Sequence, residues 1–164
     1  MEINQSNAIN YICGDERLID EIKELWEGLN EHHKRKSPYF KDHYTNFSFE
    51  TRKSDFLRKA KSGALRVELA IHKEAQKGIG YCVSSLDEEN TGEVESIFIS
   101  EDFRGLGIGE ELMKRAFKWM DQAGAVKKVV TVASGNENAF GFYKKFGFYP
   151  RKVLLEQVKT EDGR

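Results

Sequence analysis

The sequence predicts an α/β (α+β) fold, in which a mixed, mostly antiparallel, twisted sheet of six to seven strands is flanked by about four helices. Three observations predict it. Short β-branched runs recur along the chain, longer stretches show helical spacing of apolar residues, and a glycine-rich turn joins one such strand to one such helix. The 164 residues are 39% hydrophobic and contain no repeat or linker, so we expect a single domain over residues 1–164.

The amino-terminal part is expected to hold one strand and two helices. A short apolar run forms the strand, and Asp15 after it is a suitable helix cap. Pro38 and Gly63 mark where the two helices have ended, since both residue types stop helices. The expected ranges are 8–13 for the strand, 16–33 for the first helix and about 48–61 for the second.

The central part reads as three consecutive strands joined by polar turns, and therefore as an antiparallel meander. A long amphipathic helix follows, which begins at Ile108 and ends near Gly124. A fifth strand, a short helix and the last strand pieces complete the chain. The expected ranges are 65–72, 78–86 and 93–99 for the meander, 127–133 for the fifth strand, 137–146 for the short helix, and 148–149 and 153–158 for the last strand pieces.

Composition narrows the possible functions. Charged residues make up 32% of the chain but nearly cancel to a net charge of −1, which disfavours nucleic acid as a partner. No apolar run approaches membrane-spanning length, and residues 1–10 lack a secretory signal pattern. Cys13 and Cys82 lack metal-ligand spacing. We expect a cytoplasmic protein without a metal and without membrane or nucleic-acid partners.

The turn before the long helix is the most informative stretch. It consists of Arg104, Gly105, Leu106, Gly107, Ile108 and Gly109. The first amides of a helix have no partner within the helix, and together with the positive end of the helix dipole they favour an anion. Glycine lets a phosphate approach the backbone closely. Arg104 adds a fixed positive charge, so the turn is a candidate phosphate-binding loop.

Three glycine-rich phosphate loops compete for this turn. Walker A requires Lys and Ser or Thr after its last glycine, whereas Glu110 and Glu111 follow here. The dinucleotide fingerprint requires G-x-G-x-x-G, whereas the spacing here is G-x-G-x-G. The third pattern is Arg/Gln-x-x-Gly-x-Gly/Ala, which Arg104, Gly107 and Gly109 match.

At this motif the chain resembles the GCN5-related N-acetyltransferase (GNAT) family, in which that loop holds the pyrophosphate of acetyl-CoA. A second stretch, residues 136–148, is similar to the family pattern of an asparagine, a short helix that carries a tyrosine, and a Gly-Phe pair. Both stretches occur in the family's order. The predicted succession of strands and helices also resembles that of the family along essentially the whole chain.

The resemblance implies acetyl-CoA as co-substrate and roles for individual residues. It implies that Tyr143 is the general acid that protonates the leaving thiolate and that it lies at the cofactor. It implies a side-chain contact from Asn136 to the CoA arm. Backbone contacts to the pantetheine are implied for Ile97, Phe98 and Ile99, and backbone contacts to the pyrophosphate for the loop residues Gly105, Leu106, Gly107, Ile108 and Gly109 beside Arg104. The pantetheine contacts require the fourth strand to splay from the fifth.

A protonated amine must lose a proton before it attacks a thioester, so a base or a water chain is needed. Glu95 is the candidate base because a buried carboxylate would have a raised pKa, and Glu93 is the alternative if the strand register differs. His33 is a second candidate by its chemistry, although an exposed position at a helix end is expected for it.

The function expected from these features is acetyl transfer from acetyl-CoA to a primary amine of a small acceptor by direct attack. Two alternatives stay open: a peptide or protein N-acetyltransferase, and a CoA-binding sensor module without turnover. A homodimer is possible. The acceptor and the length of the acyl chain are not specified by the sequence.

Overall fold

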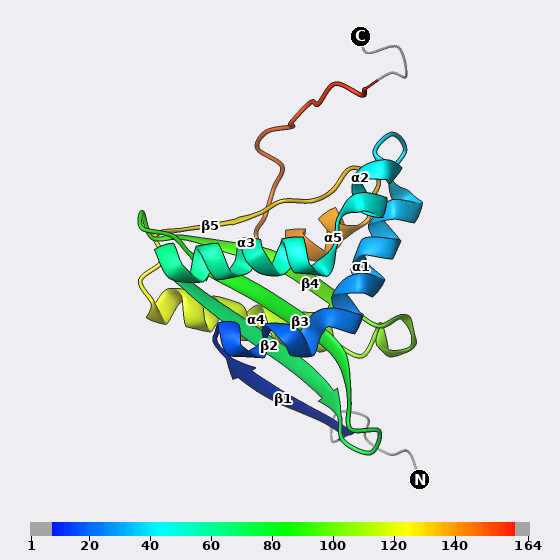
Figure 1. The fold of residues 1–164 in the computed structure, drawn as a ribbon. Coiled ribbons are helices and arrows are strands. Elements are labelled where there is room, and N and C mark those ends of the chain that lie inside the picture. Colours follow the sequence, from blue (N-terminus) through cyan, green and yellow to red (C-terminus); the bar gives the residue numbers. More distant parts are fainter. Residues whose placement is uncertain (1–7, 160–164) are drawn as a thin grey trace.

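Five strands form one sheet in the computed structural model, which describes residues 8–159 (Figure 1). The strands lie in the order β1-β2-β3-β4-β5. Neighbours pair antiparallel from β1 to β4, and β5 pairs parallel to β4. The bounds are Ile9–Gly14 for β1, Ala64–His72 for β2, Lys77–Leu86 for β3, Thr91–Ile99 for β4 and Lys127–Val130 for β5.

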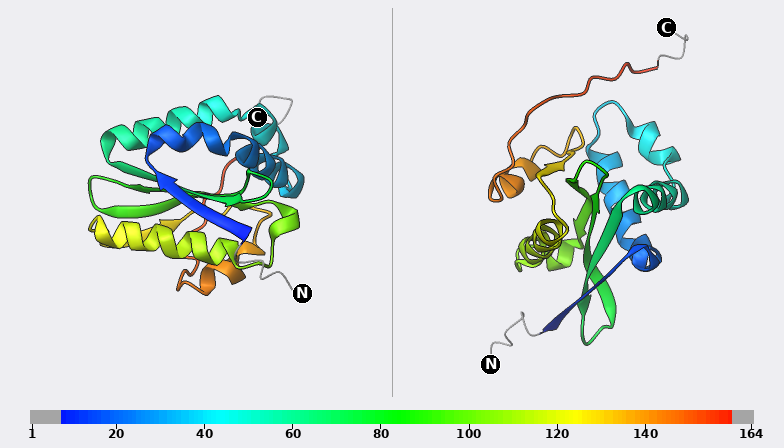
Figure 2. Two further views of the ribbon diagram at one scale, coloured as in Figure 1. Left: turned by 90° about the horizontal axis from the view of Figure 1, so that it is seen from below. Right: turned by 90° about the vertical axis from the view of Figure 1, so that its left-hand side faces the viewer.

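The helices cover both faces of this sheet (Figure 2). On one face, the buried side chains of η2, α1 and α3 pack on β2 and β3. On the other face, α4 and α5 pack on β2, β3 and β4. The helical bounds are Glu16–Ile22 for η2, Lys23–Lys36 for α1, Lys41–Asn46 for α2, Phe49–Ser62 for α3, Glu101–Phe103 for η3, Ile108–Gln122 for α4 and Ala139–Lys144 for α5.

The predicted fold class is confirmed, with differences in single elements. The expected first helix consists of a 3-10 segment, η2, followed by α1. The expected aromatic loop contains the short helix α2. The sheet has five strands among the described residues instead of six to seven, because residues 148–149 and 153–158 do not pair with it. Residues 149–159 instead extend away from the sheet (Figure 1).

The strands β4 and β5 diverge, and this divergence positions the site. Their pairing covers Thr91 to Val94 of β4 and ends there at the Val94–Val130 pair. The strand β4 continues to Ile99, so its second half lacks a strand on that side within residues 8–159. The splay expected between the fourth and fifth strands is therefore present.

No helix in the described part of the chain is long and apolar enough to cross a bilayer.

Candidate active site

The amino terminus of α4 offers free amides. Gly107 caps the helix with a φ of 78° and without a side-chain hydrogen bond, and the first contact back to it is from the Glu111 amide to its carbonyl, at 3.0 Å. Within residues 8–159, no acceptor takes the amides of residues 107–110. Four donors at the positive end of a 15-residue helix are a suitable arrangement for an anion.

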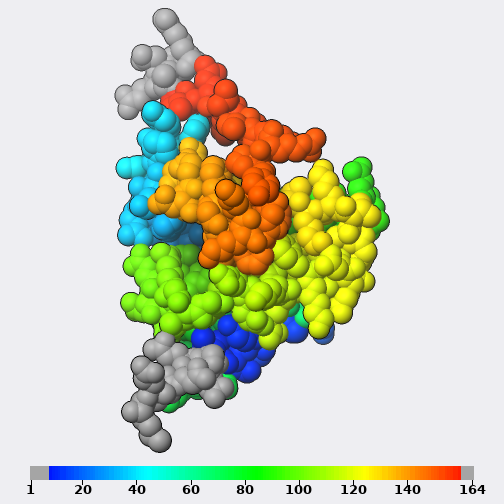
Figure 3. Space-filling view, turned by 180° about the vertical axis from the view of Figure 1, so that it is seen from behind, coloured from blue at the N-terminus to red at the C-terminus, as the bar shows by residue number. Residues whose placement is uncertain are grey.

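The glycines of this loop have two different functions. Gly105 and Gly107 each have a φ of 78°, and a Cβ on either would meet nothing within 4 Å, so both border open space. A Cβ on Gly109 would instead lie 3.3 Å from the Phe142 ring and 3.4 Å from Ile99. Gly109 therefore lets α5 pack closely against the start of α4, as Figure 3 shows from behind.

The charges around the loop leave it receptive to an anion. Glu110 and Glu111 stand in the first turn of α4, where they would repel a phosphate. Each is paired with a cation: the Lys145 ammonium lies 3.1 Å from Glu110, and the Arg115 guanidinium lies 2.8 Å from Glu111. Arg104 is partly exposed beside the loop, where its Nε donates to the Ile99 carbonyl at 3.0 Å.

The second half of β4 presents backbone groups to the space that β5 leaves. The Ser100 amide donates to the Ile79 carbonyl at 2.9 Å, so Ser100 faces β3. Backbone groups of successive strand residues point to opposite sides, so those of Ile99 and Ile97 point away from β3. Phe98 lies between them, directs its backbone toward β3 and packs its ring toward α1 near Gly28. Of the three residues predicted to hold the pantetheine, Ile97 offers an outward amide and carbonyl, and Ile99 offers its amide, because its carbonyl accepts from Arg104.

Tyr143 lies on the α4 face of the sheet with only 9% of its surface exposed. Burial raises its pKa well above the ordinary value, and the nearby Cys82 thiol adds to that shift. Because Cys82 pairs with Ile97 across β3 and β4, the phenol lies near the open edge of β4. No hydrogen bond from another described residue contributes to this pKa shift. The group is a neutral phenol that keeps its proton at neutral pH.

Asn136 lies in the turn before α5, and its side chain contacts α1 across the site. Its Oδ1 lies 3.2 Å from Nε2 of His32 on α1. The same turn approaches the end of α1 so closely that a Cβ on Gly135 would lie 2.1 Å from the Lys36 carbonyl. His32 uses one of the two acceptor sites of its oxygen, and both Nδ2 hydrogens of Asn136 are left to contact a ligand.

Glu95 has partners that argue against the predicted role of a base. Its side chain is 2% exposed and forms ion pairs with Lys59 and Arg52. Ser85 also donates to it, at 2.5 Å. These contacts place a donor from α3 or β3 on each of the two carboxylate oxygens, so neither is left open to an incoming amine. Glu93, the register alternative, shares Lys59 at 3.3 Å.

His33 is partly buried between α1 and α2, not exposed as expected, and its ring lies 5.6 Å from that of Tyr44. Burial lowers its pKa to about 4, and His32 adds to the shift. The imidazole is therefore neutral at neutral pH, although with a low pKa it is only a weak base.

Residues 8–159 line two grooves that bear on the site. One of about 330 Å³ lies between α1 and the end of β4, where Gly28, His32, Phe98 and Arg104 line it. A larger one of about 470 Å³ lies near Cys13 and Trp119, beside the far end of α4 from the glycine loop. We assign the first groove to the site because it shares His32 and Arg104 with it.

In residues 8–159, no cluster of three His, Cys, Asp or Glu side chains could hold a metal ion.

Sequence reasoning missed the contacts that converge on Glu95. Arg52 and Lys59 lie two turns apart on α3, a spacing typical of any solvated helix face. Their partners on β4, Glu93 and Glu95, lie 34 to 43 residues further along the chain. Only a known packing of α3 on β4 could have found them.

Comparison with known proteins supports one family. The model of the Acetyltransferase (GNAT) family matches residues 22–148. An uncharacterized N-acetyltransferase of Methanocaldococcus jannaschii is 32% identical over 80 residues, which span 47% of this chain and 35% of that protein. The chain thus covers about a third of this curated relative.

Solved structures agree with this fold. An acetyl transferase structure from Pyrococcus furiosus matches with a TM-score of 0.66 and 26% identity, over 90% of this chain and 99% of that chain. The PaiA N-acetyltransferase of Thermoplasma acidophilum, solved with coenzyme A, matches with a TM-score of 0.66 and 17% identity, over 89% and 92%. At this lower identity the likeness concerns the fold alone.

Proposed function

Because the chain belongs to the acetyltransferase (GNAT) family, we propose that it transfers an acetyl group from acetyl-CoA to a primary amine by direct attack. The observation that carries this proposal is the row of unpartnered amides at the start of α4, next to the unpaired edge of β4. The free amides can bind a diphosphate, and the unpaired edge of β4 can pair with an extended arm that contains amides.

In this proposal, acetyl-CoA extends from the glycine loop before α4 to the hydroxyl of Tyr143. The diphosphate of acetyl-CoA binds the amides of residues 107–110, and Arg104 adds charge at the mouth. The pantetheine arm then pairs with Ile97 and Ile99 as an extra strand would. This path brings the thioester toward Tyr143. Asn136 contributes its Nδ2 group to the arm.

The proposed reaction needs no covalent enzyme intermediate. The amine nitrogen forms a bond to the acetyl carbon, and a backbone amide of β4 stabilises the oxyanion that develops. The C–S bond then breaks, and Tyr143 donates its proton to the departing thiolate. The amine loses its own proton to water in the groove, because Glu95 is engaged by Arg52 and Lys59.

The acceptor is proposed to be a small amine that enters the groove of about 330 Å³ beside α1. Glu24, Glu31 and Glu101 line this groove together with Arg35, Lys77 and Arg104, so its lining offers carboxylates that could pair with an amine without an excess of negative charge. A peptide acceptor is the second candidate, and a sensor without turnover is the third. Two neighbours of the same fold are aminoglycoside N-acetyltransferases, at 16% and 14% identity, which is a reason to include such amines in a test.

The test is thiol release from acetyl-CoA across a panel of polyamines, amino acids, aminoglycosides and peptides with free amino termini. We expect turnover with at least one small amine and none when acetyl-CoA is omitted. Turnover with peptides alone would favour the second candidate. Calorimetric binding of acetyl-CoA without transfer to any amine would favour the sensor, and absence of binding would contradict the proposal.

We also propose that the protein is cytoplasmic and forms a homodimer. Cys13 and Cys82 are both unpaired thiols, as a reducing compartment would keep them. The residues after α5 expose Val153, Leu154 and Leu155 at 82%, 88% and 89%. A second copy is a partner that could cover this apolar segment.

A further inference from the structure

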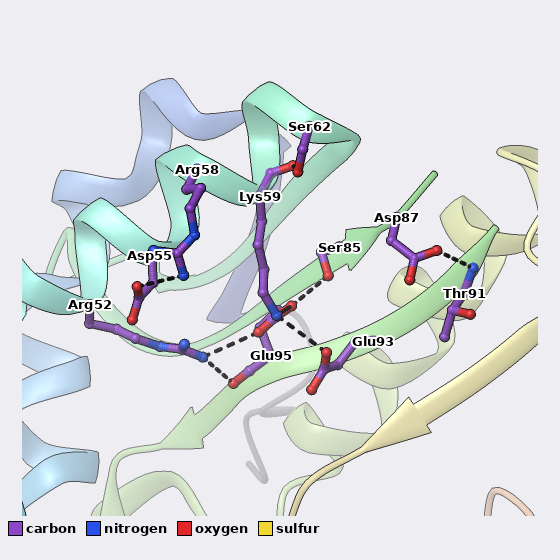
Figure 4. Close-up of polar contacts among 10 residues, drawn as sticks. All are labelled: Arg52, Asp55, Arg58, Lys59, Ser62, Ser85, Asp87, Thr91, Glu93 and Glu95. Carbon is purple, nitrogen blue, oxygen red and sulfur yellow. Dashed lines mark hydrogen bonds and ion pairs between the residues drawn. The ribbon is translucent and has the colours of Figure 1, made fainter. Parts of the chain in front are cut away.

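A buried polar cluster between α3 and β4 surrounds one residue, Glu95 (Figure 4). Arg52 Nη2 donates to the Glu95 main-chain carbonyl at 2.7 Å and to the carboxylate at 3.4 Å. Lys59 and Ser85 donate to the other carboxylate oxygen. One side chain of α3 therefore holds both the backbone and the side chain of the same strand residue.

Glu95 is the residue at which β4 departs from regular pairing. On β3, Val83 pairs with Ser96 and Ser84 pairs with Val94, so Glu95 is left without a partner. This is a β-bulge, in which one extra residue bends the strand and redirects the groups that follow. The bulge comes immediately after the last β4–β5 pair, at Val94. The bend thus stands where the open edge of β4 begins.

The helix α3 is well suited to hold the bulge. Ser48 caps its first turn through the Thr51 amide at 3.1 Å. Phe56 is fully buried and anchors the helix on the sheet, and the Arg52 guanidinium stacks over its ring at 4.3 Å. This stacking restricts the guanidinium, so the groups that hold Glu95 are themselves fixed.

We propose that Arg52, assisted by Lys59, fixes the bulge at Glu95 and so holds Ile97 and Ile99 in the geometry that receives the pantetheine arm of acetyl-CoA. Arg52 is then a positioning residue, and Glu95 an anchor instead of a base. The inference rests on the proposed function, because it concerns the same ligand. It assigns a task to a helix that lies on the opposite face of the sheet from α4.

The test compares two ligands that differ in the arm alone. Acetyl-CoA carries the nucleotide, the diphosphate and the arm, whereas adenosine 3′-phosphate 5′-diphosphate carries the first two. We expect Arg52→Met to weaken acetyl-CoA binding about tenfold by calorimetry and to leave the shorter ligand within about twofold. A merely structural residue would affect both ligands alike.

The matched control is Arg58→Met, which removes the same charge from α3. The Arg58 guanidinium is 71% exposed and pairs with Asp55 on its own helix, so it does not contact β4. We expect both affinities to be unchanged. Hydrogen exchange of peptides that cover residues 93–100 should become faster in Arg52→Met and remain as in the wild type in Arg58→Met.

Arg52→Lys is the second variant, and it serves also if Arg52→Met does not fold. It keeps the charge but loses the guanidinium that stacks on Phe56 and so holds Nη2 at the Glu95 oxygens, so we expect the same selective loss for acetyl-CoA. Wild-type affinity in Arg52→Lys, or equal weakening of both ligands in either variant, would overturn the positioning role alone. Binding of neither ligand by the wild type would overturn the diphosphate site and this inference together.

Discussion

Tyr143 is a buried phenol with a raised pKa, close to the edge of β4 that the thioester is proposed to follow. Its ring packs against Phe142 and Phe148, with centroids 5.3 Å and 6.2 Å away. These contacts depend on the ring and not on the hydroxyl. A change that removes only the oxygen should therefore leave the packing intact.

We predict that Tyr143→Phe lowers the rate of acetyl transfer about 100-fold, since general acid catalysis contributes on this order, while acetyl-CoA affinity changes by less than about twofold. Single-turnover kinetics and calorimetry measure the two quantities. Tyr149→Phe is the control, because Tyr149 is 69% exposed. An unchanged rate in Tyr143→Phe would remove this tyrosine from the mechanism.

His33 gives a prediction for the pH dependence of stability. Its pKa is about 4 in the folded protein, below the ordinary 6.5, because burial disfavours the charged imidazole and the neighbouring His32 lowers the pKa further. The unfolded chain then binds more protons between these values, so the stability contribution is lost as the pH falls from about 6.5 toward 4.

The measurement is the free energy of unfolding by urea at several pH values. We expect His33→Gln to reduce the loss of stability between pH 6.5 and 4 relative to the wild type. His43→Gln should retain the wild-type slope, because His43 is exposed on α2. Equal slopes in all three proteins would show that His33 titrates as it would in water.

At the scale of elements, the diphosphate is proposed to bind at the amino terminus of α4. A glycine at each end of this helix allows a matched pair of substitutions. Gly107 precedes the helix with a φ of 78°, and Gly124 follows it with a φ of 89°. A Cβ on either residue meets nothing within 4 Å. Both sites therefore tolerate a side chain sterically, and both impose a similar backbone strain on it.

We predict that Gly107→Val abolishes measurable acetyl-CoA binding while the chain still folds, because the side chain would fill the space that a phosphate needs. Gly124→Val should bind normally. Both variants should lose about 1–2 kcal/mol of stability, the usual cost of a left-handed conformation for an L-residue. Calorimetry and thermal unfolding provide the readouts, and normal affinity in Gly107→Val would refute the loop assignment.

At the scale of the whole molecule, the segment after α5 is the part that the single chain leaves unfinished. Its residues carry strand-forming side chains, yet they pair with nothing in the described chain and extend from the body (Figure 1). The outer edge of β5 is also unpaired among residues 8–159. A free edge and a free strand-like segment on each copy can be satisfied by exchange between two copies.

We predict that the wild type is a dimer by light scattering and that Leu154→Glu with Leu155→Glu is a monomer, because the charges prevent burial of the segment. Leu57→Glu is the control, since this leucine is 41% exposed on α3. A monomeric wild type, or a dimer that survives the double substitution, would exclude the exchange.

Local sequence patterns determined much of this protein. The glycine spacing before Ile108, the amphipathic run of α4 and the alternation in β2–β4 each act over a few residues, so each can be seen without knowing the fold. The same holds for the family, because its two motifs are contiguous stretches.

Only the tertiary structure decided the surroundings of the Glu95 carboxylate and of the His33 imidazole. Glu95 forms ion pairs because α3 brings Arg52 and Lys59 onto it, and His33 is partly buried because α2 folds against α1. It likewise decided that residues 153–158, strand-like by composition, find no strand partner among residues 8–159. Charge, burial and strand pairing depend on neighbours that are distant in sequence, and packing alone determines which neighbours a residue meets.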